Sequence, residues 1–219
     1  MKLLTRGLLP VLCLGLVSAT ALPALAHDPA SHATPQLAAL SAKAVDTQLA
    51  LRDLWVGHAF WIRNVVVAGL AHDAAARQNA EVQVVVNAKA IAAAFEPIYG
   101  KAASDKLLGL LAGHWTGVKN YFDASLAKNS AKQGAAMEEM TKNATAIAVF
   151  LSGANPNLPK DAVEGLLLAH ISHHVAQIQE LQDHKYADEA KTWALMKDHM
   201  YVIADALTGA VAKQFPDKF

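Results

Sequence analysis

The stretch Leu54–Trp61 reads LWVGHAFW, and related stretches follow at 110–117 (LLAGHWTG) and 166–173 (LLLAHISH). Each begins with a leucine and carries a histidine at its fifth position, so that His58, His114 and His170 are spaced 56 residues apart. The same offset aligns further columns of residues: Leu54, Leu110 and Leu166; Asn87, Asn143 and His199; Ile91, Ile147 and Ile203; Ala80 and Ala136; Gly109 and Gly165. So many matches at one offset indicate a threefold internal repeat.

The repeated segments have the pattern of amphipathic helices. Alanine and leucine dominate, no run alternates with period two, and apolar residues recur at helical spacing. Turns are predicted near 72–73, 128–129 and 184–185, while Pro97 with Gly100, and the segment GANPNLP at 153–159, separate successive pairs. We therefore predict an all-α fold, a six-helix bundle of three tandem helical hairpins with pseudo-threefold symmetry.

The predicted helical domain covers 37–219, with repeats at 48–103, 104–159 and 160–215. Three repeats can close around an axis or stack in a line as a short solenoid. A linear stack would hold equivalent residues about 10 Å or more apart. Closure is favoured because only a closed arrangement lets the three histidines meet.

The N-terminus has the features of a secretory signal peptide. Lys2 and Arg6 precede an apolar run, and Ala24-Leu25-Ala26 is a small-residue cleavage signal, so residues 1–26 are expected to be removed. Residues 27–36 are polar and rich in proline, and we expect a flexible tail there. This predicts a periplasmic or secreted protein. The only cysteine, Cys13, leaves with the signal, so the mature chain needs no disulfide.

The mature charge excludes some classes of partner. With Lys2 and Arg6 gone, 17 basic residues face 19 acidic ones, without a basic run. This argues against nucleic acid as a partner. No second long apolar segment follows the signal, so no transmembrane segment is expected in the mature chain.

Six polar residues interrupt the apolar stripes, and they are expected to form one layer. In a hairpin, residues equidistant from the turn face each other, and the pairs His58–Asn87, His114–Asn143 and His170–His199 are each centred on a predicted turn. Each lies about 20 Å from a helix end. A buried polar group that stays unpaired costs roughly 1–3 kcal/mol, so six in one layer need a common explanation.

The first interpretation is a metal site. Imidazole suits copper, zinc, iron and nickel, and three converging histidines leave a coordination position open. We predict His58, His114, His170 and His199 as ligands of a transition-metal ion (copper, zinc or iron), in an exported protein that binds, buffers or senses the metal. Asn87 and Asn143 would orient the ligand rings from behind, as would His174, which shares a helix face with His170.

Other interpretations stay open. One alternative is a hydrogen-bonded His–Asn network that fixes register in a non-catalytic helical scaffold, and another is a non-covalent haem held by two histidines. The mature N-terminus at His27 offers an amine and an imidazole, an alternative copper site. The sequence does not favour an enzyme, because no general base in the layer is evident besides a spare histidine. A metal ion or small ligand is thus the expected partner.

Overall fold

The computed structural model describes residues 41–219, and in this range the chain is helical without strands. The predicted signal peptide, the predicted tail and His27 lie outside the described residues. The helices are α1 (Ala42–Leu70), α2 (Ala74–Tyr99), α3 (Lys101–Leu126), α4 (Ser130–Ala154), α5 (Lys160–Gln182) and α6 (Tyr186–Gln214), followed by a short 3-10 turn at Pro216–Lys218. The prediction of an all-α fold with six helices is confirmed.

The three tight turns repeat one conformation. His72, Lys128 and His184 each adopt a positive φ, between 51° and 58°, which ends one helix and reverses the chain. In the first two turns the next residue caps the following helix: Asp73 accepts a hydrogen bond from the Ala76 amide at 2.9 Å, and Asn129 accepts one from the Lys132 amide at 3.0 Å. All three turns fall where the sequence predicts them.

The two segments that connect successive hairpins differ in detail from the prediction. Pro97 lies inside α2, in its last turn, and the chain turns only at Gly100, whose φ of 83° favours glycine. The second separation begins after α4 ends at Ala154.

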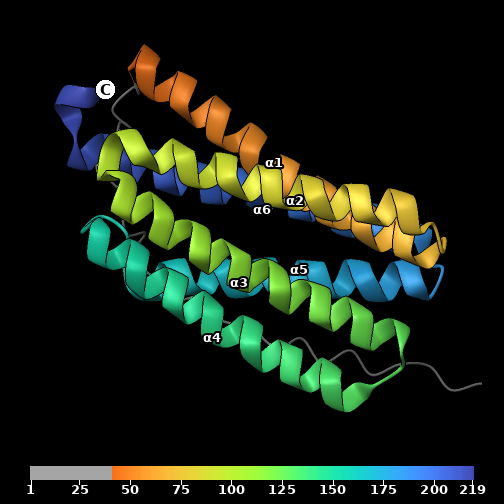
Figure 1. Cartoon of the computed structure of the whole chain (residues 1–219). Helices are drawn as coiled ribbons and strands as arrows, with labels where there is room; N and C mark the ends of the chain where they lie inside the picture. The colour runs from red at the N-terminus through yellow and green to blue at the C-terminus, as the bar shows by residue number, and fades with distance from the viewer. Residues whose placement is uncertain (1–40) are drawn as a thin grey trace, which may run out of the picture. The chain divides into compact units, whose positions relative to one another are not determined.

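The helices of the described unit form a closed ring. Each packs against its neighbours in the chain, and α1 also packs against α6 (Figure 1). Helix α5 additionally contacts α1 and α3, so the first helices of the hairpins approach one another on the inside. The pseudo-threefold symmetry of this ring stays an interpretation based on the sequence repeat.

Two forked ion pairs hold the ring closed between α1 and α6. Arg52 donates to both carboxylate oxygens of Asp205, at 2.7 and 2.5 Å, and Arg63 donates to both of Glu189, at 2.6 and 2.8 Å. Glu189 is buried and also accepts a hydrogen bond from Gln177. Paired donors and acceptors of this kind fix orientation as well as distance.

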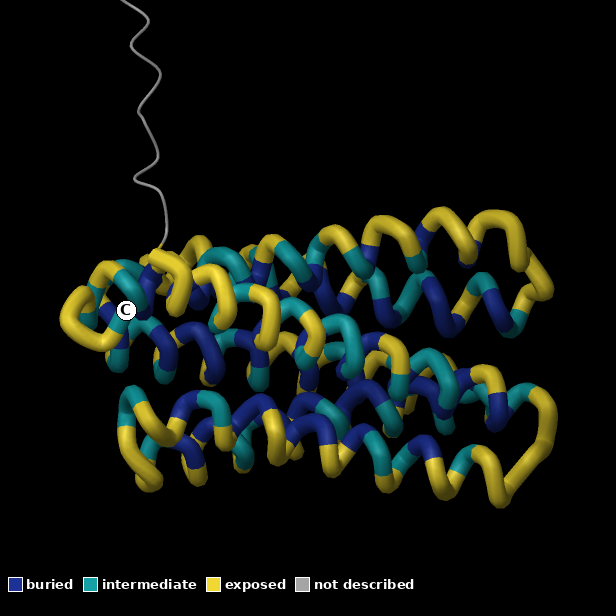
Figure 2. Tube along the Cα trace, turned by 90° about the horizontal axis from the view of Figure 1, so that it is seen from above, coloured by how far each residue is buried: buried dark blue, intermediate teal, exposed yellow. Residues whose placement is uncertain are grey.

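Buried residues line the inner faces of the helices and exposed ones the outside (Figure 2). The core is mainly alanine, leucine, isoleucine, valine and methionine, and it also holds the aromatic side chains of Phe122, Trp55 and Tyr121. Among the described helices, none is long and apolar enough to cross a membrane.

Candidate metal centre

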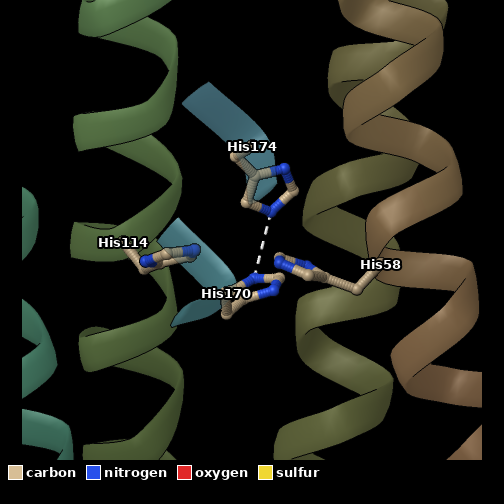
Figure 3. Close-up of side chains that lie close together, drawn as sticks. All are labelled: His58, His114, His170 and His174. Carbon is tan, nitrogen blue, oxygen red and sulfur yellow. Dashed lines mark hydrogen bonds between the residues drawn. The ribbon is translucent and has the colours of Figure 1, made fainter. Parts of the chain in front are cut away.

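Four histidines meet inside the ring. His58 comes from α1, His114 from α3, and His170 and His174 from successive turns of α5 (Figure 3). All four are buried, at 2–5% exposure. Each offers one ring nitrogen to a group in which these nitrogens lie within 4.8 Å of one another. The group consists of imidazoles alone.

The three histidines of the repeat surround a common centre. The ring centroids of His58, His114 and His170 are 5.8, 5.5 and 5.3 Å apart, which is close to an equilateral triangle. His174 lies 4.3 Å from His170 and about equally far from the other two rings, at 5.8 and 6.0 Å. Four rings from three helices therefore enclose one small space.

The imidazole nitrogens have few hydrogen-bond partners. Nε2 of His170 and Nε2 of His174 lie 3.0 Å apart, so one of them carries a proton that the other accepts. Both nitrogens of His58, Nε2 of His114 and Nδ1 of His170 are buried without a partner among the described residues. Burying polar atoms unpaired is costly, roughly 1–3 kcal/mol each, so this concentration of them points to a ligand.

Burial keeps these rings neutral. It lowers the pKa of His58 to about 3, with the nearby His114 as a second cause, and it lowers the pKa of His114 to about 4. The pKa values of His170 and His174 are also lowered well below 6.5, first by burial and then by the surrounding imidazoles. A neutral ring keeps a lone pair, which is the form that binds a metal.

The structure places His199 outside this group. His199 is half-buried, and its Nε2 lies 2.8 Å from the backbone oxygen of Leu166. Asn87 and Asn143 behave in the same way: their amide nitrogens donate to the backbone oxygens of Leu54 and Leu110, each at 3.0 Å. These three residues thus cross-link the two helices of each hairpin, and their hydrogen bonds do not reach the imidazoles.

Gly57 and Gly113, each next to a histidine in the sequence, let the amide side chains of Asn87 and Asn143 approach α1 and α3. A Cβ atom at Gly57 would lie 3.1 Å from the Asn87 amide nitrogen, and one at Gly113 would lie 2.8 Å from that of Asn143. In the third hairpin the equivalent residue is Ala169, and the longer His199 makes the hydrogen bond instead. The glycines therefore leave room for the two amides, and no unusual backbone conformation calls for glycine at either position.

His174 could have been recognised as an inward-facing residue from the repeat. Its equivalents at the 56-residue offset are Ile62 and Val118, both of which are buried in the core. Comparison with His170 alone shows only that the two share a helix face. Comparison across the repeat shows an imidazole in a column that is otherwise apolar and inward-facing.

An apolar cavity of about 40 Å³ adjoins the histidines. It is lined by His58, His114 and His170, by Trp55, and by twelve aliphatic or phenyl side chains. A porphyrin needs a far larger space, since pockets for molecules of drug size measure roughly 300–1,000 Å³. The size of the cavity argues against the haem alternative.

No protein-family model matches the chain, and neither a curated protein nor a solved structure shows significant similarity to it. The chemistry of the site therefore follows from its residues and their geometry alone. A buried set of neutral imidazoles is compatible with binding a transition-metal ion. It is unsuited to magnesium or calcium, which take oxygen ligands.

Proposed function

We propose that this protein is an exported metal-binding protein that holds one transition-metal ion between His58, His114, His170 and His174. The observation that carries the proposal is the convergence of four buried imidazoles, several of whose nitrogens have no hydrogen-bond partner. In this proposal His174 takes the place that the sequence suggested for His199. Copper, zinc and iron are the metals that suit the ligands, and binding, buffering or sensing is the proposed role.

The spacing of the nitrogens supports an ion of this kind. Ligands at about 2.1 Å from a tetrahedral zinc ion lie about 3.4 Å from one another. The Nε2 atoms of His170 and His174 are 3.0 Å apart, and the whole set of nitrogens fits within 4.8 Å. An ion would replace the proton that His170 and His174 share, and rotations of the other side chains would complete its shell.

Metal analysis tests the proposal directly. The protein would be exported with its own signal, purified without a histidine tag, and analysed for bound metals. We expect one equivalent of a transition metal, lost in His114→Ala and kept in His173→Ala, a half-buried histidine outside the group. Absence of metal from the wild type, also after reconstitution with copper, zinc and iron, would overturn the proposal.

One observation favours a structural role for the other half of the polar layer. Asn87, Asn143 and His199 bond to leucine carbonyls and make no contact of this kind with the imidazoles. A purely structural layer would tolerate His58→Leu with Asn87→Leu at unchanged or higher stability. The metal site would lose its ion in the same variant, so metal content and stability together separate the two functions.

A further inference from the structure

The four histidines and the cavity are arranged in a definite order along α5. Val163 and Leu167 line the cavity, His170 lies at its boundary, and His174 lies one turn beyond and does not line it. His58 and His114 share the boundary position with His170. An ion held by all four rings would thus have His174 on one side and the cavity on the other.

The cavity suits a small molecule of low polarity. Its volume of about 40 Å³ exceeds the roughly 10–15 Å³ that a cavity needs to hold one water molecule. Apart from the histidines and Trp55, its walls carry no polar side chain. Cavities with largely aliphatic and aromatic walls take up xenon, whereas an anion would lose much of its hydration energy on entering.

One residue of the cavity lining carries a buried hydrogen-bond donor that has no partner among the described residues. Trp55 is buried, lines the cavity, and packs edge-on to His58 with ring centroids 6.1 Å apart. Its indole nitrogen is buried and has no hydrogen-bond partner among the described residues. Buried indole N–H groups usually find an acceptor, so a molecule with an acceptor atom would satisfy the donor.

We propose that the cavity side of the metal ion binds a small uncharged diatomic molecule such as dioxygen or nitric oxide, with the Trp55 indole as hydrogen-bond donor. This inference rests on the proposed metal site and names its ligand class. Binding forms one bond between the molecule and the ion and breaks none, because the molecule adds as a further ligand on the cavity side and all four histidines stay bound.

Carbon monoxide on the protein loaded with Cu(I) is the probe. Imidazoles hold this ion, and the C–O stretching band reports both binding and surroundings. We expect a single sharp band in the wild type. Metal-loaded protein without a carbon monoxide band would overturn the inference while leaving the proposed metal function intact.

A matched pair of variants tests the cavity. Ala206 lines it, and the equivalent residue of the first repeat, Ala94, lies outside it. Ala206→Leu should fill the space and weaken carbon monoxide binding at least about tenfold at unchanged metal content, while Ala94→Leu should change it less than about twofold. Equal affinities in the two variants would show that the molecule binds elsewhere.

A second pair tests the donor. An N–H group at the bound molecule's oxygen draws electron density into the C–O antibonding orbital and lowers the stretching frequency. Trp55→Phe should therefore move the band to higher wavenumber, and Trp115→Phe, which changes a tryptophan outside the cavity lining, should leave it in place. An unshifted band in Trp55→Phe would remove Trp55 from the proposal.

Xenon separates failure of the cavity from failure of the metal site. It needs no metal, so the metal-free wild type should take up one xenon atom beside His58, and Ala206→Leu should take up none. If the protein binds no metal, both proposals fall, whatever xenon does. If it binds metal but neither xenon nor carbon monoxide, only the ligand proposal falls.

Discussion

The third hairpin, α5 with α6, differs from the first two at the positions nearest the histidine cluster. His174 stands where the other hairpins have Ile62 and Val118. His199 stands where they have Asn87 and Asn143, and Ala169 where they have Gly57 and Gly113. All three hairpins have a histidine at one position of the repeat, namely His58, His114 and His170. The repeat thus supplies three of the four rings, and the third hairpin adds the fourth, that of His174.

The departures are of two kinds. Ala169 and His199 change together and keep the hydrogen bond to a leucine carbonyl, so they offset each other. No second substitution accompanies His174. It places a polar ring in the core where the other hairpins have the aliphatic side chains of Ile62 and Val118. A polar ring at a core position where both other hairpins have an aliphatic side chain is better explained by a ligand than by stability.

Acid should unfold the metal-free protein, with the largest effect expected of any change here. The lowered pKa values mean that the unfolded chain binds more protons than the folded one below about pH 6.5. Stability is thus complete above that pH. It falls toward pH 4 by roughly 1.4 kcal/mol per pH unit for each buried histidine.

The third hairpin contributes two of the four buried histidines, and each of the other hairpins contributes one. The difference between the hairpins can therefore be measured as a difference in acid sensitivity. His170→Leu with His174→Val should halve the number of protons taken up on unfolding, whereas His58→Leu should remove only one. Guanidinium denaturation at a series of pH values gives these numbers. A slope that is the same in all three proteins would place the titrating groups elsewhere.

Restoring the aliphatic residue at 174 should separate metal binding from stability. His174→Val should weaken metal binding by about a hundredfold or more, exceeding the usual cost of losing a supporting residue. The metal-free protein should become no less stable, since a buried polar ring gives way to a side chain found at Val118. Competition with a chelator and thermal unfolding measure the two effects, and a variant that binds normally would exclude His174 as a ligand.

The three cross-links should be equivalent although their residues differ. Asn87→Ala, Asn143→Ala and His199→Ala should each cost about 1 kcal/mol, the net worth of one hydrogen bond. Denaturation of the metal-free proteins checks this. If His199→Ala abolished metal binding where the asparagine variants did not, His199 would be a ligand, as the sequence first suggested.

The smallest effect concerns the glycine beside His114. Gly113→Ala should be nearly neutral, because a gain in helix propensity of about 1 kcal/mol offsets the displaced Asn143 amide. In the Asn143→Ala background the same change should stabilise by about the full 1 kcal/mol. A double-mutant cycle measures the difference, and a coupling energy of zero would mean that Asn143 does not need the glycine.

The sequence predicted the helices, the tight turns and the meeting of three histidines, because the 56-residue offset and the helical period are both visible in one chain. It assigned His174 a supporting role because its spacing from His170 shows a shared face but not which side is inside. It placed Asn87 and Asn143 at the height of the imidazoles. Which group their amides bond to depends on the approach of two helices, permitted by Gly57 and Gly113, and no spacing rule gives that distance.

The contact between α1 and α6 has a consequence for the order of the chain. Because an even number of antiparallel helices closes into a ring, Ala42 and Gln214 belong to neighbouring helices and lie at the same end of the described unit (Figure 1). A circular permutant that joins these ends through a short linker and opens at Gly100 would begin with the second hairpin and finish with the first. Every helix would keep both neighbours, and the cluster would be assembled from the same four rings in a new sequence order.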